Sequence, residues 1–284
     1  MSLTYNIPAY AKINLFLHIT SVRSDNYHNL QTIFQFVDLH DTLNFTKRTD
    51  DKIKITSNIN ICPTTDNIVY KAAKILKNLA TRPCGIDIYI EKNIPMGAGL
   101  GGGSSNCAST LIFLNKLWNC NLTQKTLISM GANLGADVPI FIKGRTSWAE
   151  GTGALLSPFD YQEQFILLIF PKIHINTKNI FQHTNLKRNY IKIKPYQFNF
   201  DNSENVFEKI VRKSYPSIEK IFNSIPHEAK ARLTGTGSCI YCLSKNKSSL
   251  YDIVKKLNKE LDTKVIKTVN FCPVDQMIKQ KTDE

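Results

Sequence analysis

The chain has 284 residues, a formal net charge of +13 at pH 7 and 42% hydrophobic residues. This length and composition exclude a disordered chain and fit one large domain, or two closely packed ones, with an ample core. The apolar run 165–170 is far too short to cross a bilayer, so we expect no membrane partner.

The excess of basic residues has two readings. A basic protein can bind nucleic acid or another polyanion, whereas lysines that are spread along the chain more often form a solvated surface. The sequence favours the second reading, although basic and aromatic residues do alternate at Lys187, Arg188, Tyr190, Lys192, Lys194 and Tyr196. We therefore expect no nucleic acid partner, while a phosphorylated small molecule would suit a positive field.

The N-terminal residues and the cysteines both indicate a reducing compartment. No basic stretch followed by an apolar one opens the sequence, so we expect a cytoplasmic protein. The seven cysteines are an odd number, which favours free thiols. Cys239 and Cys242 have CxxC spacing, but strand-like alternation would place them on opposite faces and no second CxxC pair exists. We therefore expect no metal site built from cysteines.

The first half of the chain mixes strand and helix patterns. Residues 11–19 alternate, with Ile13, Leu15, Leu17 and Ile19 on one face and Lys12, Asn14, Phe16 and His18 on the other. Strand-like runs continue over 30–46, and helical spacing follows over 68–79. Alternation returns over 86–91, and after the glycines at 97–103 the pattern predicts a helix over 104–118.

The second half predicts further elements of both kinds. Residues 123–142 indicate a short helix, a turn, and then a strand or a second helix. The run 165–170 predicts a buried strand, 183–205 a long polar loop with a short strand-like piece, and 204–225 a helix interrupted at Pro216. A strand within 232–244, a helix over 248–261 and a last strand over 264–271 follow. The mixture predicts an α+β fold with domains at 1–158 and 159–284.

The stretch 97–103 holds five glycines between a predicted strand and a predicted helix. The first turn of a helix offers unpaired amide donors and the positive end of its dipole, and glycine lets the backbone approach an anion closely. Ser104 and Ser105 can add hydroxyl groups. A tight turn alone needs fewer glycines, so the stretch predicts a phosphate site.

Three common phosphate loops do not fit this stretch. Residues 97–102 match GxGxxG, but no acid stands near position 120 as a dinucleotide fold requires. Residues 97–104 have the spacing of a P-loop, but Gly103 replaces its lysine. The HRD and DFG signatures of protein kinases are absent. The sequence therefore predicts a nucleotide site of another kind, whose lysine comes from elsewhere.

Three ordered blocks resemble the motifs of the GHMP kinases, which are small-molecule kinases. They are "PAYAKINLFLHI" at 8–19, "PMGAGLGGGSSN" at 95–106 and "RLTGTGSCIYCL" at 232–243. The resemblance implies a ribosomal protein S5 domain 2-like N-terminal domain, a ferredoxin-like C-terminal domain, and ATP with Mg²⁺. The blocks at 26–43 and 133–153 are similar to members that phosphorylate the 2-hydroxyl of a cytidine diphosphate-linked methylerythritol. The similarity is weakest across 183–230, and a bacterial setting is implied.

Two residues are the catalytic candidates. Asp137 is the only acid between positions 100 and 143, and a carboxylate can accept the proton of the attacking hydroxyl. The resemblance gives it a role as base or as orienter of the hydroxyl; a helix cap is the structural alternative. Lys12 shares a strand face with Asn14 and is the candidate for the missing lysine. The resemblance pairs it with Asp137, while a surface lysine is the alternative.

The resemblance also implies the binding residues. ATP is assigned to Pro95, Met96, Gly97, Ala98, Gly99, Leu100, Gly101, Gly102, Gly103, Ser104 and Ser105. The acceptor substrate is assigned to Asn14, Tyr27, His28, Phe181 and Thr236. Tyr27 and Phe181 suit stacking on a base and His28 its polar edge, with a core role as the alternative for the aromatic residues. No acidic magnesium ligand can be placed. Another GHMP kinase, with a mevalonate-type or amino-alcohol substrate, is the nearest rival.

Overall fold

The computed structural model describes residues 4–81, 83–272, 274 and 278, and it confirms the mixed α+β class. The strands are β1 Thr4–Val22, β2 His28–Lys47, β3 Ile53–Ser57, β4 Ile86–Glu91, β5 Ser147–Gly151, β6 Leu155–Pro158, β7 Phe165–Phe170, β8 Arg232–Leu233, β9 Ile240–Ser244 and β10 Asp262–Val269. The helices are α1 Ile68–Leu79, α2 Gly102–Leu117, α3 Gln124–Leu134, α4 Val138–Lys143, α5 Thr177–Gln182, α6 Glu208–Ser214, α7 Pro216–Ser224 and α8 Lys247–Lys256, with short 3₁₀ helices at Pro195–Gln197 and His227–Ala229.

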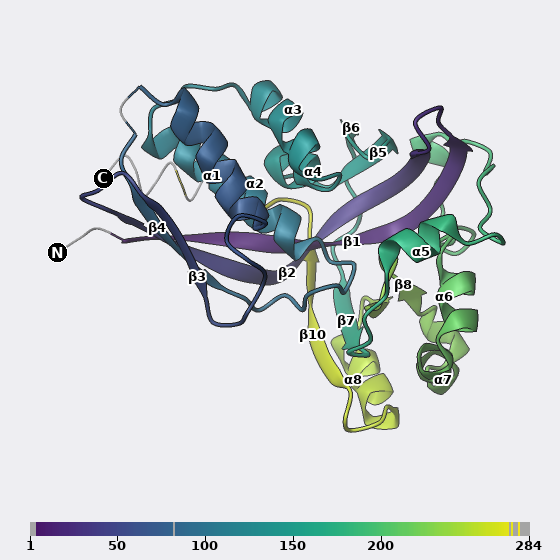
Figure 1. Cartoon of the computed structure of the whole chain (residues 1–284). Coiled ribbons are helices and arrows are strands. Elements are labelled where there is room, and N and C mark those ends of the chain that lie inside the picture. Colours follow the sequence, from purple (N-terminus) through teal and green to yellow (C-terminus); the bar gives the residue numbers. More distant parts are fainter. Residues whose placement is uncertain (1–3, 82, 273, 275–277, 279–284) are drawn as a thin grey trace.

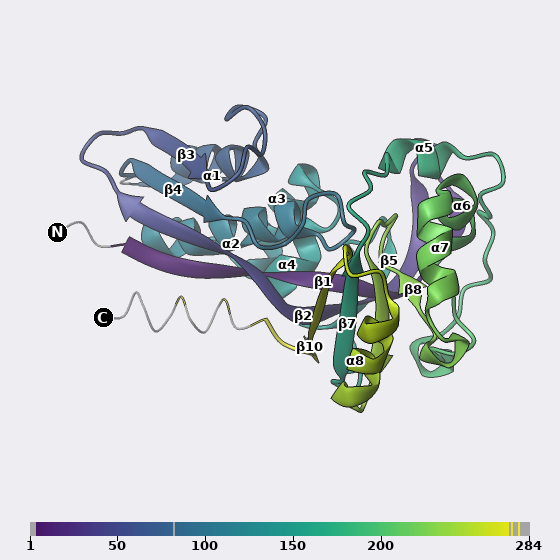
Figure 2. The ribbon, with the colours of Figure 1, turned by 90° about the horizontal axis from the view of Figure 1, so that it is seen from below.

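The strands of the described residues join in the order β3-β4-β2-β10-β7-β9-β8, with β1 and β5 also paired to β2. The β3–β4 pair is parallel, and the pairs of β2 with β1, β4 and β5 are antiparallel. The long strands β1 and β2 cross the whole molecule, and α1 to α4 lie on one side of the N-terminal part of β1 and the C-terminal part of β2 (Figures 1 and 2). The other end of the molecule carries β7 to β10 with α5 to α8. Both ends of the molecule are therefore built on β1 and β2 (Figures 1 and 2).

Separate apolar cores fill the two ends of the molecule. One core lies between α1–α4 and the first half of the sheet, and it includes Phe45, Ile88 and Phe113. The other lies under α6–α8 and includes Leu167 of β7 and Ile240 of β9. Cys242 belongs to this second core, whereas Cys239 belongs to a third apolar cluster that includes Ile13 and Leu168. The two cysteines of the CxxC pair therefore face opposite sides of their strand, as predicted. The domain boundary at 158 and 159 stays a prediction.

A bulge in β1 changes which side chains face the site. Asn14 pairs with Phe34 and Leu17 with Thr32, so β1 holds one residue more than β2 between these pairs. Leu17 therefore lies on the same side as Asn14 and lines the same cavity. The predicted alternation of 11–19 is wrong beyond Asn14, because the extra residue reverses the phase. The carbonyl oxygens exposed at the bulge accept hydrogen bonds from Thr32, Arg232 and Tyr241.

The segment 183–205 is a long loop, as predicted, and it packs on β1. The predicted short strand-like piece is wrong, because the loop, all of which the structure describes, holds a 3₁₀ helix at Pro195–Gln197 and no strand. Tyr190 donates its amide to the carbonyl of Ile19, and its ring stacks on His18 with centroids 4.2 Å apart. The Tyr190 hydroxyl donates to Glu204, at 2.5 Å. Tyr190, one of the aromatic residues of this loop, thus contacts the protein itself.

The buried His18 gives the fold a pH dependence. Burial lowers its pKa to about 4, from an ordinary value near 6.5. The unfolded chain therefore binds a proton first, so stability is complete above pH 6.5 and falls as the pH drops towards 4. We expect His18→Phe to reduce that fall by about 2 kcal/mol. Urea unfolding at pH 7 and pH 4.5 measures it; equal pH dependence in both proteins would contradict the assignment.

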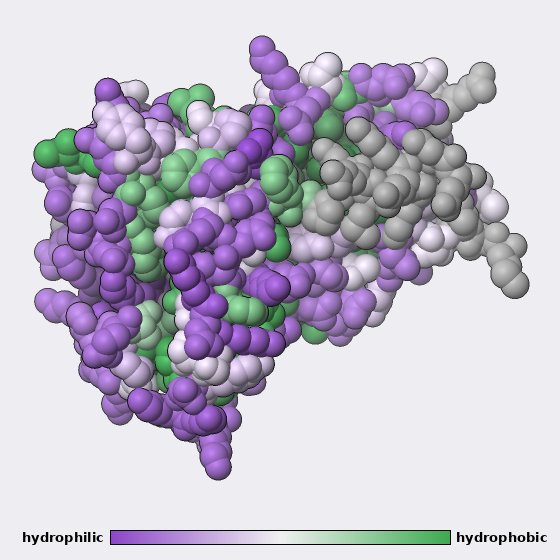
Figure 3. Space-filling view, turned by 180° about the vertical axis from the view of Figure 1, so that it is seen from behind, coloured by the Kyte–Doolittle hydropathy of each residue, from purple (hydrophilic) through white to green (hydrophobic). Residues whose placement is uncertain are grey.

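No helix within the described ranges is long and apolar enough to cross a membrane. On the face that Figure 3 shows, hydrophilic residues cover most of the surface and apolar residues appear in small groups between them. This distribution agrees with lysines that are spread over a solvated surface.

Candidate functional site

Three segments far apart in the sequence meet at the site. Lys12 of β1 donates its amide to the carbonyl of Leu100, and Cys239 donates its amide to the carbonyl of Ala98. The Asn14 amide donates to the hydroxyl of Thr234, at 3.0 Å. The strand at 8–19, the glycine loop and the turn at 234–237 therefore form one hydrogen-bonded unit.

The glycine loop separates two cavities. One cavity, of about 560 Å³, contains Lys12, Asn14, Asp137 and Thr236 in its wall. The other, of about 410 Å³, is lined by the loop from Pro95 to Ser104 together with residues of the α1 and β4 ends. Four loop residues line both cavities: Gly97, Gly99, Gly101 and Ser104. A group bound in one cavity can therefore meet a group bound in the other across this loop.

The loop opens directly into the N-terminus of α2. Gly101 is the N-cap and has a left-handed backbone, with φ 73° and ψ 17°. The helix starts at Gly102, two residues before the predicted start, and runs for 16 residues. Its first-turn amides and the positive end of its dipole lie at the cavity wall, which is a favourable place for a phosphate.

Gly99 and Gly103 make a matched pair for testing the loop. Gly99 has φ +76°, and a Cβ there would lie 2.2 Å from the carbonyl oxygen of Thr234. A Cβ on Gly103 meets no atom of the described residues within 4 Å. We expect Gly99→Ala to lower the free energy of unfolding by about 3 kcal/mol. Gly103→Ala should change it by about 0.5 kcal/mol or less, in either direction.

Chemical denaturation of the nucleotide-free proteins measures both values. Equal stability of the two variants would show that the left-handed backbone and the contact with Thr234 are not required. A loss confined to Gly99→Ala supports the close packing of the two glycine turns.

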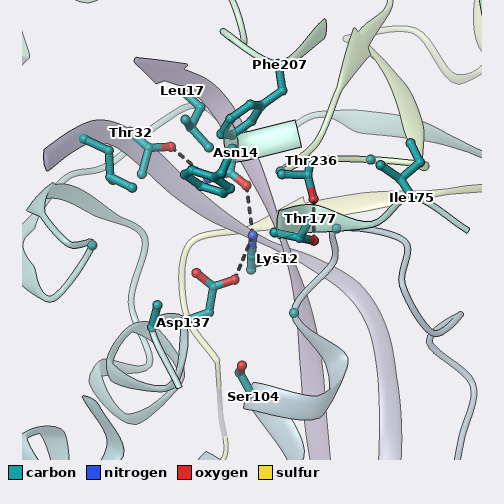
Figure 4. Close-up of a pocket in the computed structure, with 18 of the residues that line it drawn as sticks. Lys12, Asn14, Leu17, Thr32, Ser104, Asp137, Ile175, Thr177, Phe207 and Thr236 are labelled. Carbon is teal, nitrogen blue, oxygen red and sulfur yellow. Dashed lines mark hydrogen bonds and ion pairs between the residues drawn. The ribbon is translucent and has the colours of Figure 1, made fainter. Parts of the chain in front are cut away.

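Lys12 and Asp137 form an ion pair inside the first cavity. The Lys12 Nζ lies 3.2 Å from the Asp137 carboxylate, with the lysine side chain 3% exposed and the aspartate 34% exposed. Lys12 Nζ also donates to Asn14 Oδ1, at 2.9 Å, and Asn14 Nδ2 donates to the hydroxyl of Thr32. Figure 4 shows this chain of contacts. The buried lysine is therefore held in one place, and the carboxylate keeps a solvent-facing side.

Asp137 does not act as a helix cap, and Lys12 is not a surface lysine, which were the alternatives to catalytic roles. Asp137 stands at the N-cap of the six-residue α4, but its carboxylate makes no capping hydrogen bond with a described residue. Lys12 is buried and not a surface lysine. Both side chains face the cavity.

The predicted substrate residues do not all reach the cavity. Asn14, Phe181 and Thr236 line it, and the Thr236 hydroxyl lies 3.0 Å from that of Thr177. His28 lies beside Phe181, with ring centroids 5.3 Å apart. Tyr27 is 69% exposed at the tip of the β1–β2 hairpin. Ser105, predicted to bind ATP, is buried, and Ser104 is the serine that lines both cavities.

Several site residues were not among the predicted ones. Thr32 and Thr234 hold Asn14, and Thr177 pairs with Thr236. Thr32 and Thr234 lie inside the blocks at 26–43 and 232–243, but the sequence alone does not indicate what either threonine contacts. Asn106 lines the second cavity, and its Oδ1 is buried without a hydrogen-bond partner among the described residues. An unpaired buried amide in a cavity is a place where a ligand can bind. Asn106 is the last residue of the block at 95–106, and its place on the second turn of α2 was a further hint.

Among the residues that the structure describes, no three His, Cys, Asp or Glu side chains gather as a metal site. Ser104 lines both cavities at the glycine loop and offers a hydroxyl oxygen, a kind of ligand that Mg²⁺ prefers. A single side-chain ligand fits an ion that is held mainly by phosphate oxygens and water.

Comparison with known proteins connects this geometry to a family. A family model described as the GHMP kinases N terminal domain matches residues 67–145, and one described as GHMP kinases C terminal matches residues 187–263. A protein of Francisella philomiragia named 4-diphosphocytidyl-2-C-methyl-D-erythritol kinase is 46% identical over 94% of this chain and 97% of its own.

Two further proteins are similar over nearly the whole chain. A protein of Hahella chejuensis with the same name is 41% identical over 98% of this chain and 97% of its own. A crystal structure of 4-(cytidine 5'-diphospho)-2C-methyl-D-erythritol kinase is 25% identical, with a TM-score of 0.80, and covers 93% of this chain and 99% of that one.

Proposed function

The chain belongs to the GHMP kinase family, and on this premise we propose that it transfers a phosphoryl group from ATP to the 2-hydroxyl of 4-diphosphocytidyl-2-C-methyl-D-erythritol. The products are the 2-phosphate and ADP, in the non-mevalonate pathway to isoprenoid precursors. The chain is a small-molecule kinase, as predicted from its motifs. The single observation that carries the assignment to this acceptor is the 46% identity over 94% of the chain to a protein of that name.

We assign ATP to the cavity behind the glycine loop and the acceptor to the cavity with Lys12 and Asp137. This assignment is supported by the loop residues that line both cavities, Gly97, Gly99, Gly101 and Ser104. A terminal phosphate at this wall would face the acceptor hydroxyl on the other side. Phosphoryl transfer depends chiefly on such positioning and on charge stabilisation.

Asp137 is proposed to take the proton of the attacking hydroxyl. A carboxylate is a weak base towards an alcohol, so it accepts the proton late, once bond formation has acidified the hydroxyl. Lys12 stabilises the negative charge that develops on the attacking oxygen, and it holds the carboxylate in place through their ion pair. The hydrogen bonds through Asn14 to Thr32 fix the lysine, which reduces reorganisation during the reaction.

We propose Mg²⁺ as the ion that accompanies ATP. When bound, it supplies positive charge that neutralises the phosphates. Ser104, which lines both cavities, is the side chain that would hold it, together with phosphate oxygens and water.

The cytosine of the acceptor is proposed to lie near Phe181 and His28, at the end of the cavity lined by Leu30. Phe181 offers a flat face for stacking, and His28 offers ring nitrogens for the polar edge of the base. Tyr27 is close in sequence and exposed, so it would have to turn towards the base on binding. The bacterial relatives also support a bacterial cytoplasmic setting, which we include in the proposal.

A substrate panel tests the proposed function. Purified protein is given ATP, Mg²⁺ and, in separate reactions, the cytidine diphosphate-linked methylerythritol, mevalonate or homoserine, and ADP release is followed. We expect turnover with the first compound at a kcat/KM at least about a thousandfold above the others. Comparable or greater turnover of mevalonate or homoserine would assign the chain to another branch of the family.

A further inference from the structure

Arg188 connects the long loop to the predicted base site. Its Nε donates to the Nε2 of His28, at 3.2 Å. Its Nη1 donates to the carbonyl of Leu186, and its Nη2 donates to the carbonyls of Phe181 and His183, at 2.8 and 3.0 Å. A single guanidinium therefore ties the end of α5, the loop after it and the start of β2 together.

This contact selects one form of the His28 ring. A guanidinium only donates hydrogen bonds, so the Nε2 of His28 must present a lone pair to Arg188. The neutral imidazole then carries its proton on Nδ1. No described residue accepts a hydrogen bond from this Nδ1. The remaining ring nitrogen is therefore a donor without a partner in the described part of the protein.

The surroundings of His28 favour the neutral ring. Burial lowers its pKa, and the positive charge of Arg188 lowers it further. Other charged or titratable groups of the packed elements have contacts of their own or face the cavity: Arg23 pairs with Asp25, Lys187 lies over the Tyr190 ring, His183 accepts from the Asn185 amide, and Lys178 lines the cavity. The ring thus remains neutral and a single-site donor around neutral pH.

With the base placed against Phe181, as proposed above, the ring of His28 would meet the edge of the stacked pyrimidine. Its ring lies beside that of Phe181, and both Phe181 and Leu30 line the cavity with Lys12 and Asp137. Cytosine and uracil differ along that edge: N3 of cytosine accepts a hydrogen bond, whereas N3 of uracil carries a proton and donates. A fixed donor distinguishes the two, because it leaves two donors facing each other with uracil.

We propose that Arg188 is a positioning residue that keeps the proton of neutral His28 on Nδ1, so that the ring recognises N3 of cytosine and rejects uracil. The inference rests on the proposed function for the nature of the base, and it adds a residue that sets specificity without contacting the substrate. Without Arg188, the ring can take either tautomer and can accept from uracil as well as donate to cytosine.

Two measurements test this proposal without relying on turnover. Nitrogen-15 NMR of histidine-labelled protein reports which ring nitrogen of His28 is protonated, with His28→Gln used to assign the signal. Calorimetry measures the binding of CDP and of UDP to the wild type, to Arg188→Met and to Lys187→Met. Lys187→Met is the matched control, because it removes the neighbouring positive charge but no contact with His28.

We expect the wild type to show the Nδ1-protonated ring and to bind CDP at least about tenfold more tightly than UDP. Arg188→Met should lose most of that preference and show a mixture of tautomers, whereas Lys187→Met should keep the preference. The change of tautomer would not follow from a loosened loop alone.

An Nε2-protonated ring in the wild type overturns the proposal. It is also overturned if Arg188→Met weakens CDP and UDP equally, because Arg188 would then only hold the loop. Turnover of the proposed substrate without any preference for CDP would leave the kinase function intact and remove this inference. If the proposed substrate is not turned over but the protein still shows an Arg188-dependent preference for CDP, the kinase function is contradicted and this inference is supported.

Discussion

Asp137→Asn should lower kcat about a thousandfold while the affinity for ATP changes less than about twofold. The reason is that Asp137 faces the cavity of the acceptor, on the other side of the glycine loop from the cavity assigned to the nucleotide. The asparagine keeps the size of the side chain but cannot accept the hydroxyl proton. Steady-state kinetics by ADP release and calorimetry with an ATP analogue measure the two quantities.

Asp137→Ala separates the two roles that the sequence left open. If Asp137 acts as the base, the alanine and asparagine variants should be about equally slow, because neither accepts a proton. If it mainly orients the hydroxyl, asparagine should retain much more activity than alanine. Asp160→Asn is the matched control, since Asp160 is 60% exposed and pairs with Arg145 on the surface. A kcat for Asp137→Asn within tenfold of the wild type would contradict the role as base.

Lys12→Met should lower kcat about a hundredfold or more, because the developing charge on the attacking oxygen loses its cation. The lysine is 3% exposed and contacts both Asp137 and Asn14, so methionine fills its space without replacing its charge. The same steady-state assay measures the loss. Lys209→Met provides the control, because Lys209 is 84% exposed on α6.

The double variant Lys12→Met/Asp137→Asn shows whether the two residues act as one unit. We expect it to be about as slow as the slower single variant, because residues that depend on each other give non-additive losses. Losses that multiply would mean that each residue acts independently, and the ion pair would then have no part in catalysis.

The local patterns of the sequence predicted most of the fold. The alternation of 86–91 became β4 Ile86–Glu91, and the helical spacing of 68–79 became α1 Ile68–Leu79. These predictions were possible because burial of one face leaves a period in the sequence. The bulge in β1 left no such period, since it depends on pairing with β2 and on hydrogen bonds from Arg232 and Tyr241, which are more than 200 positions away.

The sequence predicted those site residues that lie together in one short segment. Lys12 and Asn14 were expected on one strand face, and they are joined by a hydrogen bond of 2.9 Å. The pairing of Lys12 with Asp137 came from the family resemblance, and the ion pair at 3.2 Å agrees with it. Arg188 could not be identified, because it lies in a loop without periodicity and acts through residues distant in the sequence.

Phosphorus NMR of the products formed from ATP, Mg²⁺ and 4-diphosphocytidyl-2-C-methyl-D-erythritol tests the proposed reaction. We expect ADP and a new phosphate monoester signal. The carbon that carries the new phosphate bears a methyl group and no hydrogen, so this signal should show no coupling to a proton on that carbon. The diphosphate signals of the cytidine group should be retained. Release of inorganic phosphate alone, or a monoester on a hydroxyl other than the 2-hydroxyl, would contradict the proposed reaction.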